Sequence, residues 1–394
     1  MRRICSMEIF SRIILVLFYA AAGAWVLLRH SPVDYPPYAM AAWGFQRGEN
    51  VYRWGETDYA RAAATLGFEH YAPPYRYPPL TALLVLPLLT LPDRGMGLWI
   101  FLQALCALLT AEALARLFGE PGRPWQRTLI RMSVGLFPPF LVSLYAGQVN
   151  PLVVLLATLT LQTIRRGQEG RGGFLLGLSL MLKPLAVGVA GLLLWEGRWR
   201  ALRGMALGIA IALGMSALAF GPPALEFLRA PMASAGGAYP PAQNLPSMAI
   251  RWLTRHPYGS ALIDAPIAAQ WMGGALAGAI VLLTLAGLGR PGTPREPLED
   301  RAAWATAAAF LANPGTWYHH GVMLSLALGV LLRRAGRRPP LWNAALAISV
   351  GAVALWGLAW HAFVGWTFML DLGTLGALGL WILLAREIGR RRAL

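Results

Sequence analysis

The sequence predicts an all-α polytopic membrane protein, and three observations carry that prediction. Hydrophobic residues make up 57% of the 394 positions and charged residues only 13%, whereas a soluble domain is about a quarter charged. The mean hydropathy is +0.51, and many apolar stretches are long enough to cross a hydrocarbon core of about 30 Å. Because helices satisfy their own backbone hydrogen bonds in lipid, the spans are expected to be helical.

The net charge of +16 lies mostly in short arginine clusters between the apolar stretches. Clusters of this kind mark cytoplasmic turns under the positive-inside rule, so they do not indicate nucleic acid binding. Both termini are therefore expected in the cytoplasm. The clusters fall within residues 2–3, 123–127, 165–171, 198–203, 290–301, 333–338 and 390–392.

The apolar segments between these clusters predict about 11–13 transmembrane or half-membrane helices, and residues 1–394 are expected to form one membrane domain. The first segment is long and more spans follow, which favours an uncleaved span over a signal peptide. Residues 79–118 resemble two helices, although the charge pattern allows them only an odd number of crossings. The segments are 9–28, 79–92, 95–118, 128–146, 150–164, 174–182, 184–195, 203–220, 259–288, 302–312, 321–333, 341–360 and 363–385.

Two polar segments are expected on the extracytoplasmic side. Residues 29–77 follow the first span and carry nearly balanced charges, and they form the large first extracytoplasmic loop. Residues 221–258 are rich in proline and glycine. Prolines in Tyr35-Pro-Pro-Tyr38 and in the run that ends at Tyr77-Pro-Pro79 are expected to exclude regular helix there.

Three pairs of short apolar runs meet at polar tips. The tips are 147–151, 183–184 and 313–320, and each pair begins and ends near an arginine cluster. All three tips are therefore expected on the outer side, together with Asp34. Irregular backbone at membrane depth is tolerated where it lines a cavity or is packed in protein.

Lys183 is the only lysine in a chain with 34 lysine and arginine residues. An ammonium at membrane depth costs several kcal/mol unless it is paired or solvated. The flanking apolar runs are too short to span the membrane separately, so we expect a hairpin with Lys183 at its turn; a single kinked helix is the alternative. An anionic lipid head group is the natural partner for this cation.

Asp34 lies at the outer mouth of the first span, where a carboxylate can act as a general base or remain a solvated loop acid. His319 and His320 can bind a phosphate oxygen, orient an acid–base pair, or belong to an interfacial aromatic belt. No paired or clustered acids predict a divalent metal site, and the two cysteines, Cys5 and Cys106, have no metal-site spacing and are not expected to pair.

The remaining candidates are neutral donors and outer-side cations. Gln148 and Asn150 suit sugar hydroxyls and equally suit helix capping. Arg76 and Arg251 are positioned to join Lys183 at a phosphate, or else to face solvent or lipid. Tyr77 belongs to an aromatic and proline run whose rings can stack on a sugar or lie at the lipid interface.

The order and spacing of these motifs resemble glycosyltransferase family 87, which has the GT-C membrane fold. Asp34-Tyr-Pro-Pro-Tyr38 and Tyr77-Pro-Pro-Leu80 look like the family's first loop and the start of its next helix. Residues 147–150 and 177–184 are similar to its central blocks. Asn244, with Arg251, and the segment from Asn313 to His320 look like the later blocks, although a serine-proline start is commoner in the last one.

The resemblance implies an inverting transfer from a polyprenyl-phosphate sugar, with no cofactor, on the extracytoplasmic face of a bacterial cytoplasmic membrane. Asp34 matches the aspartate that deprotonates the acceptor, a lipid or glycan of the cell envelope. Lys183, His319 and His320 would stabilise the departing phosphate. Mannose is the favoured sugar and arabinofuranose the alternative, while a non-enzymatic transporter of the polyprenyl phosphate is the competing class.

Overall fold

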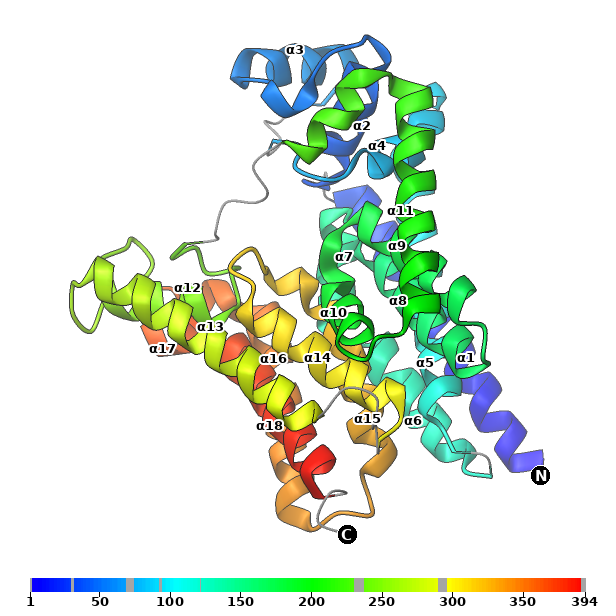
Figure 1. The fold of residues 1–394 in the computed structure, drawn as a ribbon, viewed down its shortest axis with the longest axis vertical. Helices are drawn as coiled ribbons and strands as arrows, with labels where there is room; N and C mark the ends of the chain where they lie inside the picture. The colour runs from blue at the N-terminus through cyan, green and yellow to red at the C-terminus, as the bar shows by residue number, and fades with distance from the viewer. Residues whose placement is uncertain are drawn as a thin grey trace.

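The computed structural model describes residues 2–29, 32–68, 74–91, 94–120, 122–229, 237–289 and 296–390, and within them every regular element is helical (Figure 1). Seven helical segments within these residues are long and apolar enough to cross a membrane. They comprise α1 (Arg2–Arg29), α5 (Gly95–Phe118), α6 with α7 (Pro124–Gly135, Pro138–Ala146), α11 (Trp199–Phe220), α13 (Pro266–Leu288), α16 with η6 (Pro340–Ala359, Trp360–Phe363) and α18 (Leu372–Arg390). The prediction of an all-α polytopic membrane protein is confirmed.

The other apolar segments are shorter helices, as the half-membrane lengths predicted. Two helices begin later than predicted: α13 begins at Pro266 rather than 259, and α18 begins at Leu372 rather than 363, after a turn with Gly365 at φ 96°. The shorter helices are α4 (Pro79–Val85), η2 (Leu86–Thr90), α8 (Asn150–Arg165), α9 (Glu169–Leu182), η3 (Pro184–Ala186), α10 (Val187–Trp195), α14 (Leu298–Ala312), η5 (Tyr318–Leu324) and α15 (Ser325–Arg334).

Residues 79–118 contain one helix long enough to cross a membrane. The segment Pro79–Thr90, formed by α4 and η2, has about 18 Å of helix at 1.5 Å per residue, short of the roughly 30 Å core. The 24-residue helix α5 meets that length. One crossing in this stretch agrees with the charge pattern, and α4 packs instead against α2 and α11.

The polar segments are more regular than expected. Residues 29–77 contain α2 (Tyr35–Gln46), η1 (Val51–Arg53) and α3 (Glu56–Leu66), which gather with α4 at one end of α11 (Figure 1). The expectation that proline excludes helix from Tyr35 to Tyr38 is wrong, because proline is tolerated in a first helical turn, where backbone donors need no partner. The later outer elements are η4 (Pro222–Leu228), α12 (Leu245–Leu253) and α17 (Thr367–Leu370).

The segment around Lys183 is a hairpin rather than one kinked helix. Gly173 faces Ala201 and Gly177 faces Met205, so residue numbers rise together along α9 and α11 and the two helices are parallel. The connecting helix α10 must therefore run back, and Arg198 after it pairs with Glu169 at the start of α9 at 2.7 Å. A side chain at Gly173 would collide with the Ala201 backbone, which explains the glycine.

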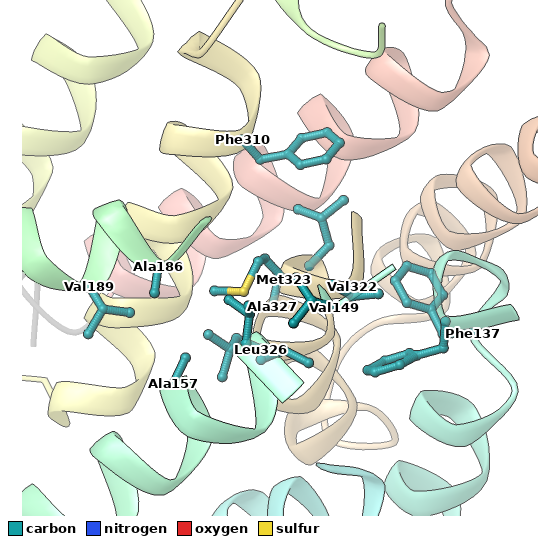
Figure 2. Close-up of a cluster of buried hydrophobic side chains, with 14 of the residues drawn as sticks. Phe137, Val149, Ala157, Ala186, Val189, Phe310, Val322, Met323, Leu326 and Ala327 are labelled. Atoms are coloured by element: carbon teal, nitrogen blue, oxygen red, sulfur yellow. The ribbon is translucent and has the colours of Figure 1, made fainter. Parts of the chain in front are cut away.

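Ion pairs join the helix ends opposite the polar tips. Asp300 binds Arg333 and Arg334 at 2.5 Å each, and Glu299 binds Arg165 at 3.2 Å. These arginines belong to the clusters that the sequence predicts at cytoplasmic turns, and each forms an ion pair with a carboxylate on another helix. Nearer the tips, apolar side chains from α8, η3, α14 and η5 pack together, and Figure 2 shows Val149, Ala186, Phe310 and Met323 in this buried cluster.

Candidate active site

Asp34 is the N-cap residue of α2, yet its carboxylate caps nothing. An N-cap side chain accepts from the backbone N–H of the second or third helical residue, and here those residues are Pro36 and Pro37, which have no N–H. The Asp34 backbone N–H donates to Ala146 O at 2.8 Å. The residue is therefore held by its backbone, and its carboxylate is left for another purpose.

A left-handed turn at Gly147 brings the first polar tip to Asp34. Gly147 has φ 74°, and a Cβ there would lie 2.9 Å from Pro32 Cβ and 3.2 Å from Tyr35 Cβ. Trp99 Nε1 donates to Gly147 O at 2.8 Å and so holds the turn from α5. Glycine permits both the conformation and the close approach, and the next residue, Gln148, consequently lies beside Asp34.

The Gln148 side chain, which is 1% exposed, links the other groups. Its Oε1 accepts from Lys183 Nζ at 2.8 Å and from Tyr38 Oη at 3.0 Å. Its Nε2 donates to Tyr77 Oη at 3.2 Å and the amide also hydrogen-bonds Asp34. An amide has two acceptor and two donor positions, so this one is fully used by the protein.

Lys183 is the C-cap residue of α9 and is 6% exposed. Its ammonium lies 5.0 Å from the centroid of the Tyr77 ring. Among the described residues no carboxylate oxygen lies within 4.0 Å of Nζ. One amide oxygen and one ring face do not offset the cost of burying a positive charge, so this cation is undercompensated. An anionic ligand would supply the missing negative charge.

The third tip, Trp317 to His320, lies beside the first. His319 O accepts from Ser143 Oγ at 3.2 Å and Asn150 Nδ2 at 3.1 Å. Trp317 N donates to His320 Nδ1 at 3.0 Å, so the proton of the neutral ring is on Nε2. That Nε2–H is buried and has no partner within the described part of the chain. It is a free donor next to the Lys183 cation.

Burial sets the protonation of these groups. Burial, and secondly the Lys183 charge, hold the pKa values of His319 and His320 well below the usual range, so both rings are neutral at pH 7. Burial also raises the pKa of Asp34, although Lys183 and Gln148 oppose that shift. Burial also lowers the pKa of Lys183, to about 7, although the Asp34 charge opposes that shift. The resulting site combines one carboxylate, one ammonium whose charge depends on nearby anions, and neutral imidazole donors.

The structure brings together most of the predicted site residues, while Asn244 and Arg251 serve structural contacts. Asn244 caps α12 by accepting from Ser247 N at 2.8 Å and donates to Thr316 O at 2.9 Å. Arg251 is fully buried, where it pairs with Asp371 and donates to the backbone carbonyls of Tyr239 and Ala242. Arg76 is exposed.

Two contributors escaped the sequence analysis. Tyr38 lies one turn after Asp34 on α2 and donates to Gln148. Residues four apart lie on one face of a helix, so a helix predicted over this stretch would have placed Tyr38 beside Asp34. Ser143 supports the His319 carbonyl, and nothing local marks it. Within the described residues no group of three or more histidine, cysteine, aspartate or glutamate side chains is arranged to hold a metal ion.

Comparisons with known proteins identify a family and two relatives. A family model described as Glycosyltransferase family 87 matches residues 75–314. Two relatives named Alpha-(1->3)-arabinofuranosyltransferase, from two strains of Mycobacterium tuberculosis, are each 28% identical over 173 residues. The alignments cover 43% of this chain and 37% of each relative, so the chain matches little more than a third of those proteins. The family match includes Gln148 and Lys183, while Asp34 and His320 lie outside it.

Proposed function

Because the chain belongs to glycosyltransferase family 87 and is a multi-pass membrane protein, we propose that this glycosyltransferase moves a sugar from a polyprenyl-phosphate donor to a cell-envelope lipid or glycan. The site residues are Asp34, Lys183 and His320. The observation that carries the proposal is the uncapped carboxylate of Asp34 beside an undercompensated, buried cation.

In this proposal Asp34 is the general base. The acceptor hydroxyl oxygen attacks the anomeric carbon of the donor sugar, and Asp34 takes the hydroxyl proton. The bond from the anomeric carbon to the phosphate oxygen breaks, and its electron pair leaves with the phosphate. Attack opposite to the leaving group inverts the anomeric configuration, and one carboxylate is enough because phosphate needs little protonation on departure.

Lys183 and His320 would bind the leaving phosphate. The ammonium supplies the charge, and the unpartnered Nε2–H of His320 supplies a directed donor. Both become more favourable as negative charge develops on the phosphate, which is electrostatic stabilisation of the transition state. The His319 ring contacts the rings of Trp317 and His320 and so helps to position His320. Asn150 holds the same segment by donating to the His319 carbonyl.

The sugar proposed first is arabinofuranose, since both relatives are named as arabinofuranosyltransferases; mannose, favoured by the sequence analysis, is the other donor to test. The proposed location is a bacterial cytoplasmic membrane with the site on the extracytoplasmic face. A cysteine introduced for Glu56 in α3, with Cys5 and Cys106 changed to serine, should react with an impermeant maleimide in intact cells. Labelling only after permeabilisation would place the site on the other face.

The test uses purified protein in liposomes with polyprenyl-phosphate arabinofuranose or mannose and octyl glycoside acceptors. Asp34→Asn should lower turnover by about 100-fold or more, the size of a general-base contribution, while donor binding stays within about twofold. Asp58→Asn is the matched control, because Asp58 accepts from the Gly55 N–H at 3.1 Å and serves α3. Near-normal turnover of Asp34→Asn refutes the assignment, and donor binding without transfer by the wild type would indicate a transporter.

A further inference from the structure

A cavity of about 450 Å³ lies in the turn between α12 and α13, away from the Lys183 cluster. An isolated bridge between His256 and Gly259 shapes the turn. The lining is polar: Arg255 and Asp264 pair with each other at 3.1 Å and are largely exposed, and the His256 nitrogens contact Arg251 O and Tyr258 N. Its volume is within the range of about 300–1,000 Å³ that small-ligand sites occupy, and the polar lining suits hydroxyl-rich ligands.

A row of aromatic rings connects this cavity to the proposed active site. The His256 ring lies 6.1 Å from Tyr258, and Tyr258 lies 5.7 Å from Tyr239, centroid to centroid. Tyr239 lies 5.4 Å from Trp317, which lies 6.1 Å from His319. We refer to Tyr258, Tyr239 and Trp317 as the aromatic row.

The backbone holds the aromatic row in place. Arg251 Nη1 donates to Tyr239 O at 3.2 Å, and Gly365 N donates to Tyr258 O at 2.7 Å. The neighbouring Tyr318 N donates to Pro241 O at 2.7 Å, which ties the segment carrying Tyr239 to the tip carrying Trp317. The backbone that carries the rings is thus anchored before any ligand arrives, which lowers the entropic cost of binding.

The rings leave surface for a ligand. Tyr239 is 37% exposed, and Tyr258 and Trp317 are half-buried. Successive rings meet edge to face at 60° and 62°, so neighbours do not cover each other's faces by stacking. Flat aromatic faces bind the apolar faces of sugar rings, while the tyrosine hydroxyls can pair with sugar hydroxyls. A lipid chain could cover the rings but would meet the charged pair of Arg255 and Asp264 at the end of the row, whereas sugar hydroxyls can hydrogen-bond to both.

We propose that the aromatic row and the cavity lined by His256 and Asp264 bind the sugar units of a glycan acceptor that precede the unit attacked beside Asp34. This inference rests on the proposed function and adds a subsite for an extended saccharide. The transferase would then prefer acceptors of several units over a single glycoside, and the preference would depend on Tyr258.

The experiment compares an octyl arabinofuranoside with an octyl arabinofuranosyl tetrasaccharide as acceptors. Tyr258→Ala should raise the KM for the tetrasaccharide about fivefold, the size of one lost aromatic contact, and leave kcat, the donor KM and the KM for the monosaccharide unchanged. Tyr258→Phe keeps the ring and should retain most of the preference. Trp271→Ala is the matched control, because Trp271 is 77% exposed on α13 outside the row.

Two results would overturn the subsite: equal KM values of the wild type for both acceptors, or an equal change for both in Tyr258→Ala. Saturation-transfer NMR with the tetrasaccharide separates this inference from the proposed function, because it measures binding without turnover. A wild type that binds the tetrasaccharide through Tyr258 but transfers no sugar refutes only the function. A wild type that transfers sugar but shows no Tyr258-dependent binding refutes only the subsite.

Discussion

Gln148→Leu tests whether the amide keeps Asp34 and Lys183 apart. In the structure Oε1 of Gln148 accepts from Lys183 at 2.8 Å and from Tyr38 at 3.0 Å, and Nε2 donates to Tyr77 at 3.2 Å. Leucine fills a similar volume but removes these bonds and the hydrogen bond to Asp34. A lost bond to a charged group costs about 1.5–3 kcal/mol and a neutral one about 1 kcal/mol, so the two charged and two neutral bonds together amount to about 5–8 kcal/mol before Lys183 and Asp34 pair with each other.

The functional consequence differs from simple destabilisation. Without the amide, the Lys183 ammonium is expected to turn to Asp34 and form a direct ion pair. Loss of the Gln148 hydrogen bond by itself raises the Asp34 pKa, but an opposite charge in direct contact stabilises the carboxylate and lowers its pKa by more. Asp34 therefore becomes a weaker base and Lys183 a weaker phosphate ligand. Turnover should fall tenfold or more, and the acid limb of the pH–rate profile should move to lower pH.

The assay is a pH–rate profile in liposomes at saturating donor, with thermal unfolding recorded in parallel. Gln103→Leu is the matched control, because Gln103 is also 1% exposed and lies on α5 outside the site. It should change stability and leave the acid limb in place. A folded Gln148→Leu protein with an unshifted acid limb would refute the idea that this amide separates the two charges.

Further expectations concern charge and metal. Because burial raises the pKa of Asp34, activity should be lost as the pH falls through a value above the pKa of an exposed aspartate. In Lys183→Gln the opposing cation is gone, so any residual activity should be lost at a still higher pH. An acid limb of the pH–rate profile at the ordinary aspartate pKa would contradict this. Lys183→Gln should also weaken donor binding about tenfold or more, whereas Lys183→Arg keeps part of it; equal donor affinity in titrations would exclude the phosphate role. Arg251→Met should destabilise by about 3–5 kcal/mol by leaving Asp371 buried without its partner, and Arg251→Met with Asp371→Leu should recover much of the loss in unfolding measurements; no recovery would assign Arg251 another role. Activity should survive EDTA, and rescue of a chelated enzyme by Mg²⁺ or Mn²⁺ would reveal an overlooked metal site.

The three polar tips show how far local pattern reaches. Lengths of apolar runs and positions of arginine clusters predicted hairpins at 147–151, 183–184 and 313–320, and the contacts from Gln148 to Lys183 and from Asn150 to the His319 carbonyl confirm that the tips meet. These features can be predicted locally, because the length of each apolar run, compared with the thickness of the bilayer, decides by itself whether that run can span the membrane. The prediction that Pro36 and Pro37 exclude a helix was wrong, because it ignored that proline is tolerated in the first turn of a helix.

The sequence by itself determined the helical membrane class, the hairpins and the isolation of Lys183, since each depends on composition and spacing within one segment. Only the tertiary structure decided which polar groups remain available for a substrate. Arg251 is committed to Asp371, 120 residues away, and Gln148 is saturated by protein partners, whereas Asp34 is uncapped and the Nε2–H of His320 is unpaired. The physical reason is that a buried polar group takes whichever partner packing brings near, and no local pattern specifies that partner.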